Sequence, residues 1–215
     1  MSTTAEKQSL FGKKERKLLS DPLDDNNPIT VQVLGICSAL AVTVALKPAM
    51  VMTLAVIAVM GFASLIISLL RKMVPSRVRI IVQITVIAFL VILVDQILKA
   101  FSYDVYTQLS VYIGLIITNC IVMGRLEAFA MGNKPWSSFL DGVGNGIGYG
   151  IILIGVAFFR EFFGKGELFG WAVPYLSEIE FFQNGMMLTP AAAMFVIGLM
   201  IWWQRARNTK LVDIS

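Results

Sequence analysis

Long apolar stretches separated by short polar connections dominate this chain. A transmembrane helix needs roughly 20 mostly apolar residues, and six segments reach or approach that length. They are approximately Ile29–Leu46, Ala49–Leu70, Ile80–Leu98, Val105–Gly124, Gly142–Phe159 and Gly185–Trp203. Because these segments use most of the 215 residues, no room is left for a separate soluble catalytic domain. The pattern predicts an all-α membrane protein with six transmembrane helices.

The composition agrees with a membrane bundle. Hydrophobic residues make up 57% of the chain and charged residues 15%, and the mean hydropathy is +0.75. A soluble domain would be about one-quarter charged. Residues 1–28 are polar and contain neither an apolar core nor a cleavage site, so they are not a signal peptide. We therefore expect a cytoplasmic tail (1–28), a membrane bundle (29–204) and a C-terminal tail (205–215).

The basic residues predict the orientation of the chain. With the N-terminus in the cytoplasm, the opposite side keeps only four of the 18 Lys and Arg residues, namely Lys47, Lys99, Arg160 and Lys165. The positive-inside rule therefore places both termini in the cytoplasm. This bias accounts for the net charge of +4. No basic stripe with interleaved aromatic residues indicates nucleic-acid binding.

The number of segments suggests an internal repeat. A short polar break at Ser102–Asp104 divides the chain into halves of about 29–100 and 105–204, each with three segments. Because three is odd, the two halves must cross the membrane in opposite directions. The sequence therefore predicts a 3+3 inverted repeat. Repeats of this kind bring interrupted helices together near the membrane midplane.

Two cysteines lie in comparable positions of the two halves, and the chain has no histidine. Cys37 is nine residues after Pro28, a helical rise of about 14 Å that reaches the middle of a ~30 Å membrane core. Cys120 lies at a comparable depth from the opposite side. Two thiolates at one depth indicate half of a metal site, completed by another chain. The alternative is that each cysteine is simply a small buried apolar residue.

We expect the helices that carry the cysteines to be interrupted. The expected breaks are Gly35, Ser38 and Pro48 in the first segment, and Gly114, Thr118-Asn119 and Gly124 in the fourth. Irregular backbone at membrane depth occurs where it faces protein or a cavity. The glycines could instead allow close helix packing. Asn119 is different, because a buried amide needs hydrogen-bond partners.

Two acidic residues stand at the ends of apolar segments. Asp95 and Asp141 are candidates for an ion path, because acids in membrane segments are costly. Alternatively, Asp95 pairs with Lys99 at i+4, and Asp141 marks a helix start. Two further combinations are interpreted as structural interfacial pairs: Arg160 with Glu161, and Arg125 with Glu127.

Glycine occupies every second position in DGVGNGIGYG (141–150). The spacing is not that of a dinucleotide-binding fingerprint, and no strand precedes it. On a helix, Gly142, Gly146 and Gly150 share one face, and Gly144 and Gly148 share an adjacent one. The run therefore predicts close helix packing. A partner chain or ligand against these faces is the alternative.

Three stretches resemble a known family. They are residues 26–37, LIITNCIVMGRLEAFA (115–130) and DGVGNGIGYG (141–150). They are similar to the D-subunit family of sodium-translocating NADH:quinone oxidoreductases, which is related to the E subunit of Rnf complexes. The similarity extends from Asp24 over nearly the whole chain. The 115–130 block is shared by both complexes, whereas Val94-Asp95-Gln96 and the glycine run favour the NADH:quinone member.

The resemblance implies a role in electron transfer. It implies that Cys37 and Cys120 are metal ligands of one [2Fe–2S] cluster, shared with two cysteines of a homologous E subunit. It also implies a multi-pass protein of the bacterial inner membrane, assembled with subunits A, B, C and F. That complex passes electrons from NADH to ubiquinone and exports Na+, a function in which Asp95 and Asp141 would handle the ion. No flavin is expected here, since the chain lacks a Ser/Thr-Gly-Ala-Thr attachment motif.

Other functions remain open at this point. The chain could be an Rnf-type subunit that transfers electrons between ferredoxin and NAD, a stand-alone secondary transporter, or a scaffold. A transporter or a scaffold would contain no iron and would tolerate loss of both cysteines. Iron content therefore separates these alternatives from a redox subunit.

Overall fold

The structure is a computed structural model that describes residues 13–23, 26–101, 112, 114–165, 167–168, 171–172 and 185–207. Most of these residues are helical, and turns occupy residues 26–35, 43–45, 71–78 and 131–134. The described part also contains an antiparallel pair of two-residue strands, β1 (Glu167–Leu168) and β2 (Trp171–Ala172). The prediction of a helical membrane protein is confirmed for this part of the chain.

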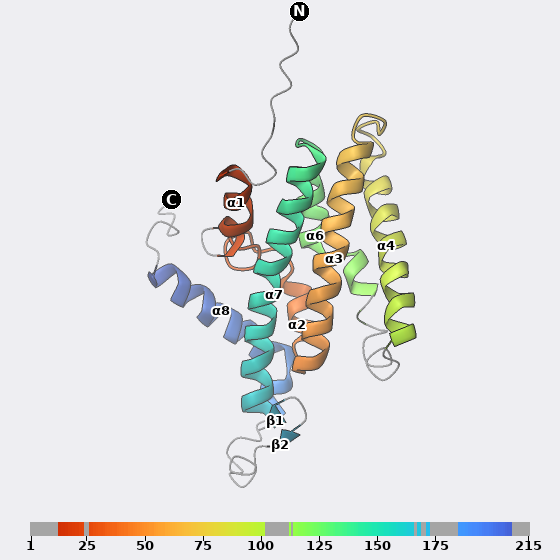
Figure 1. Ribbon diagram of the computed structural model, residues 1–215. Coiled ribbons are helices and arrows are strands. Elements are labelled where there is room, and N and C mark those ends of the chain that lie inside the picture. The colour runs from red at the N-terminus through yellow and green to blue at the C-terminus, as the bar shows by residue number, and fades with distance from the viewer. Residues whose placement is uncertain are drawn as a thin grey trace, which may run out of the picture.

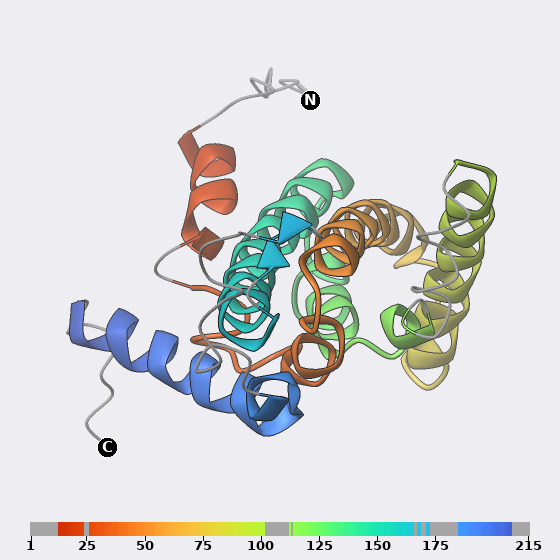
Figure 2. The same cartoon turned by 90° about the horizontal axis from the view of Figure 1, so that it is seen from below.

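Three long helices form the centre of the bundle. They are α3 (Leu46–Leu70), α4 (Arg79–Phe101) and α7 (Pro135–Lys165). Each is long and apolar enough to cross a membrane. Helix α3 lies between α4 and α7, and α3 and α7 run in opposite directions (Figures 1 and 2). Three of the six expected segments are thus helices of spanning length, whereas six spans in a 3+3 inverted repeat remain a prediction.

Both cysteine segments are interrupted, as expected. In the first, turns lead into the short helix α2 (Ile36–Val42). In the fourth, residues 114–117 are helical, Thr118-Asn119 is not, and α6 (Cys120–Arg125) follows. Helix α6 then continues into the π-helix η2 (Leu126–Ala130). Neither segment is one continuous helix.

Four of the expected breaks are wrong. Ser38 lies within α2, Gly124 lies within α6, and Gly114 is helical. Pro48 is the third residue of α3, where a proline is tolerated because the first amides of a helix have no carbonyl partner. The first segment ends instead at the turn formed by residues 43–45.

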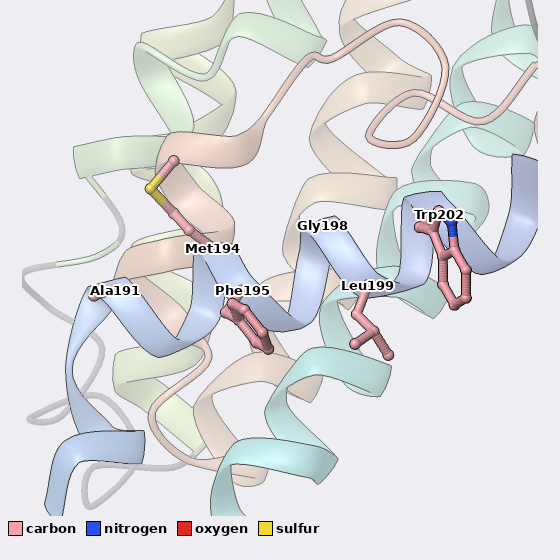
Figure 3. A pocket seen from close by; sticks show the side chains of 6 residues that line it. All are labelled: Ala191, Met194, Phe195, Gly198, Leu199 and Trp202. Atoms are coloured by element: carbon pink, nitrogen blue, oxygen red, sulfur yellow. The ribbon is translucent and has the colours of Figure 1, made fainter.

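The sixth segment forms the 3-10 turn η4 (Gly185–Leu188) and helix α8 (Pro190–Arg207). Helix α8 begins beside the lower end of α7 and extends obliquely away from the bundle (Figures 1 and 2). Phe195, Leu199 and Trp202 project from the same side of α8 (Figure 3) and are all more than half exposed. Such an apolar face is typical of a surface that meets lipid or another subunit.

The glycine run packs α7 tightly against α3. A Cβ atom on Gly150 would overlap Thr53 Cγ2, and one on Gly142 would lie 2.8 Å from the Met60 carbonyl oxygen. Gly146 has similarly little space on this face. Only glycine allows the two backbones to approach this closely. The predicted role of this face in helix packing is confirmed.

The second glycine face is covered by the N-terminal segment. The cover consists of α1 (Lys13–Ser20) and the 3-10 turn η1 (Asp21–Leu23). A Cβ atom on Gly144 would lie 2.7 Å from the Leu18 carbonyl oxygen. A Cβ atom on Gly148 would overlap the carbonyl oxygen of Pro22. Part of the expected polar tail is therefore packed on the membrane bundle.

Arg160 and Glu161 connect the ends of several helices. Arg160 is fully buried and donates to Thr43 Oγ1 (2.6 Å) at the end of α2 and to the Leu188 carbonyl (2.7 Å) in η4. Glu161 accepts a hydrogen bond from the amide of Leu46, the first residue of α3. Their structural role was expected, and the structure adds that both residues are buried and bind the ends of neighbouring helices.

Candidate metal centre

The structure brings the two cysteines together. A small cavity of about 40 Å³ is lined by Cys37, Ser38, Leu115, Thr118, Asn119 and Cys120. Both cysteines are exposed at the surface of the chain and neither forms a disulfide. Residues from two separate helix breaks thus form one site that is open to the outside.

An unusual turn places Cys37 in the first turn of α2. Val33 and Gly35 have φ values of 58° and 82°, both in the left-handed region. This conformation is costly for a β-branched residue such as valine and is available to glycine. A Cβ atom on Gly35 would also lie 3.1 Å from Tyr149 Cε2. The turn before Cys37 is therefore shaped by its contact with α7.

Asn119 places Cys120 at the start of α6. Its backbone is extended (φ −69°, ψ 119°), and its side-chain oxygen accepts from the Ile121 amide at 3.4 Å. This is the geometry of a helix N-cap, which satisfies an amide that has no partner within the helix. Cys120, the next residue, is the first residue of α6.

Ser38 connects the two helix starts. Its Oγ atom lies 2.9 Å from the Gly35 carbonyl oxygen, 2.8 Å from Tyr149 Oη and 3.2 Å from Asn119 Nδ2. A serine hydroxyl has one hydrogen and two lone pairs. Since the carbonyl can only accept, Ser38 donates to Gly35 and accepts from Asn119 and Tyr149. All three side chains are buried, and the hydroxyl of Ser38 is fully satisfied.

The site lies level with the middle of a spanning helix. Tyr149 is close to the midpoint of α7, and its hydroxyl contacts the residue after Cys37. The mid-membrane depth of the cysteines stays a prediction. Sequence reasoning did not identify Tyr149 or the linking role of Ser38. The available signal was that Tyr149 is the one aromatic residue in the glycine run.

The donors on this chain fit half of an iron–sulfur site. Among the described residues, no group of three or more Cys, Asp or Glu side chains could hold a metal. The cavity offers two thiols, and the chain has no histidine. Iron–sulfur clusters are usually held by four cysteine thiolates. Two adjacent, outward-facing thiols match such a cluster only if a second chain supplies the other two.

Asp141 forms a buried ion pair instead of starting a helix. Arg125 of α6 donates to both carboxylate oxygens, with Nε 3.0 Å from Oδ2, and Asn145 Nδ2 donates at 3.2 Å. Asp141 is 2% exposed and lies well inside α7, so its interpretation as a helix start is wrong. The expected pairing of Arg125 with Glu127 is also wrong, because Glu127 forms an ion pair with Arg79 at 2.5 Å.

Asp95 and Asp141 lie in different parts of the bundle. Asp95 is half-buried towards the C-terminal end of α4, whereas Asp141 is in the first third of α7. Helix α3 separates these two helices (Figure 2). Neither carboxylate lines the cysteine cavity. The structure therefore does not join the two acids into one site, and their role in ion transport remains a prediction.

Three helices of membrane-spanning length and two cysteines that line one cavity are the features of an integral membrane protein with paired thiols. The family model described as "Rnf-Nqr subunit, membrane protein" matches residues 16–201, and the chain belongs to this family. The match covers most of the chain, including α2, α6 and both cysteines. The family resemblance seen in the sequence is confirmed.

Similar proteins align over almost the whole chain. The D subunit of the Na(+)-translocating NADH-quinone reductase of Photobacterium profundum is 60% identical over 192 residues, which are 88% of this chain and 91% of that protein. Proteins of the same name from Shewanella sp. (strain W3-18-1) and Shewanella halifaxensis are 54% identical over 203 and 205 residues. In both cases the alignment covers 94% of this chain and 97% of the relative.

Proposed function

We propose that this chain is the D subunit of a Na+-translocating NADH:quinone reductase. Its Cys37 and Cys120 supply two of the four ligands of an intramembrane [2Fe–2S] cluster shared with the homologous E subunit. The near-full-length relatives that carry the D-subunit name support the first part. One observation supports the second: thiols from two distant helix breaks line the same outward-facing cavity. When bound, such a cluster would accept and release single electrons.

The surroundings of the cysteines suit a ligand site that closes on partner docking. Ser38 follows Cys37, and Asn119 precedes Cys120. The polar groups of both residues point into the protein. The two thiols are left on the exposed side. A dry interface with the E subunit would then exclude water from the cluster ligands. The other expected partners are subunits A, B, C and F, together with membrane lipid.

The distribution of basic residues supports an orientation with cytoplasmic termini in the bacterial inner membrane. The connection between α3 and α4 and the start of α7 lie at one end of the bundle, and α1 lies beside the half of α7 nearer to that end (Figure 1). Lys17, Arg77 and Lys134 belong to these three regions. Positive charge is retained on the cytoplasmic side of membrane proteins. We assign this end to the cytoplasm.

Asp95 and Asp141 are proposed to act in Na+ transport by the complex. Ionisable side chains in membrane segments commonly mark ion pathways. Asp141 is held by Arg125, so it would influence the ion through its charge rather than by direct binding. Asp95 is half-exposed and is the better candidate for contact with the ion.

Serine substitution of the cysteines in the assembled complex tests the proposal. Cys37→Ser or Cys120→Ser should abolish the [2Fe–2S] electron paramagnetic resonance signal and NADH-driven quinone reduction. Electron entry into the first flavin should survive, because another subunit carries it. Wild-type iron content and quinone reduction in the double variant would exclude a ligand role. That result would favour a transporter or a scaffold.

A further inference from the structure

We infer that Tyr149 is a positioning residue that fixes the two cysteine-bearing helix starts relative to each other before any metal binds. The inference concerns this chain's own geometry. Its relevance to a cluster rests on the proposed function. Tyr149 does not line the cysteine cavity and is not a ligand. It acts through the residues next to the two thiols.

Three hydrogen-bonded side chains form a direct link between the cysteine segments. Tyr149 donates a hydrogen bond to the hydroxyl oxygen of Ser38, the residue after Cys37. Asn119, the residue before Cys120, donates to the same oxygen. The Tyr149 ring also packs against Gly35, where the chain turns into α2. Displacing Tyr149 would therefore disturb both the turn that orients Cys37 and the polar link to Asn119.

The position of Tyr149 is fixed because the backbone of both neighbouring residues, Gly148 and Gly150, is in close contact with other parts of the bundle. The Gly148 carbonyl accepts a hydrogen bond from Asn27 Nδ2 at 3.1 Å, and the Cα of Gly148 lies against Pro22. Gly150 is packed against Thr53 of α3. Close contacts on two sides leave α7 little freedom to rotate or slide at this point. The hydroxyl of Tyr149 is thus directed at Ser38 by the central packing of the bundle.

The hydroxyl group of Tyr149 also needs this network. The side chain is 0% exposed, and burying a hydroxyl without a hydrogen-bond partner is unfavourable. A phenylalanine would fill the same space without that requirement, so packing alone does not explain a tyrosine here. Outer-shell groups of this kind commonly orient metal ligands. Fixing the thiols in advance lowers the entropy cost of assembling the site.

The test measures the placement of the thiols without relying on activity. Tyr149→Phe removes one oxygen and preserves the ring, and Tyr112→Phe is the matched control on a half-buried tyrosine outside the network. Membranes containing the whole complex are stripped of iron and treated with dibromobimane, a short thiol–thiol cross-linker. Mass spectrometry then quantifies the Cys37–Cys120 link. We expect Tyr149→Phe to lower its yield severalfold and Tyr112→Phe to leave it unchanged.

The loaded complex provides a second measurement. Tyr149→Phe should broaden or shift the [2Fe–2S] resonance and change its midpoint potential at an unchanged yield of assembled complex. Ser38→Ala should have a similar effect, and the double variant should add little, because both changes break the same link. Wild-type cross-linking together with a wild-type resonance in Tyr149→Phe would overturn the inference. So would a lower assembly yield with normal cross-linking in the complexes that form.

The two proposals fail independently. If the wild-type complex has no iron that depends on Cys37 or Cys120, the proposed function is wrong. The cross-linking result would still decide whether Tyr149 positions the thiols. If iron is present and depends on both cysteines while Tyr149→Phe changes neither measurement, only the positioning role is wrong.

Discussion

Arg125, the last residue of the helix that begins at Cys120, forms a two-point ion pair with Asp141 of α7. The side chains are 14% and 3% exposed. In this buried setting, removing one partner leaves an uncompensated charge, which costs about 3–5 kcal/mol. The pair therefore fixes α6, and with it the segment that carries Cys120, against α7.

Asp141→Asn should accordingly lower the yield of assembled complex, because the Arg125 guanidinium would lose its counter-charge. Replacing both residues by apolar ones of similar size, as in Arg125→Met with Asp141→Leu, should recover much of that yield. Size-exclusion chromatography of the solubilised complex measures the effect. A normal yield for Asp141→Asn, with a weakened sodium response, would instead assign Asp141 to ion transport alone.

The sequence predicted the elements that depend on local patterns. The apolar runs located α3, α4 and α7, and the alternating glycines predicted close helix packing without naming the partner helix. The breaks at Gly35 and Thr118-Asn119 were also predicted, because glycine and asparagine favour non-helical backbone at these positions.

Pairings between distant residues could not be predicted in the same way. Arg125 has two nearby acids in the sequence, Glu127 and Asp141, and only the packing of α6 on α7 selects Asp141. Tyr149 contacts Ser38 from another helix across 111 positions of sequence. Ser38 itself was expected to break α2, but its hydroxyl bonds back to the Gly35 carbonyl within the first turn and is compatible with the helix.

A methyl group at Gly150 should loosen the contact between α3 and α7. The new Cβ would overlap Thr53 Cγ2, and the Thr53 hydroxyl is bonded to the Ala49 carbonyl at 2.8 Å, which holds its rotamer. Overpacking of this kind costs typically about 1–3 kcal/mol. Gly150→Ala should therefore lower the thermal unfolding midpoint of the complex.

Gly198→Ala on α8 is the matched control for that experiment. A Cβ atom at Gly198 would meet nothing within 4 Å. Alanine also favours a helix over glycine by about 1 kcal/mol. We expect Gly198→Ala to leave the midpoint unchanged or slightly raised. An equal drop in both variants would mean that the Gly150 contact does not govern stability.

Asp95→Asn should weaken the dependence of turnover on sodium while iron content and assembly remain normal. The side chain is half-buried and belongs to α4, away from the cysteine cavity and from the Arg125–Asp141 pair. Loss of its charge should therefore affect an ion without affecting the metal ligands. The measurement is the rate of quinone reduction over a series of sodium concentrations. An unchanged sodium response would leave Asp95 with a structural role.

Reporter fusions test the orientation derived from the charges. Fusions at Ser215 and within residues 71–78 should both report a cytoplasmic position, because the basic residues of these regions resist translocation. A fusion after Lys47 should report the opposite side. Lys47 lies at the start of α3, and residues 71–78 follow the other end of this helix (Figure 1). A periplasmic signal from either of the first two fusions would contradict the assignment.

This chain should be unable to hold an iron–sulfur cluster by itself. It offers two thiols in an exposed cavity, it has no histidine, and the described residues contain no larger group of metal-binding side chains. Four thiolates are normally needed, so two positions would be open to solvent or lipid. The purified chain should contain no stoichiometric iron, whereas co-expression with the E subunit should yield a [2Fe–2S] signal that either Cys37→Ser or Cys120→Ser removes. Recovery of a full cluster on the isolated chain would show that the site does not require a partner.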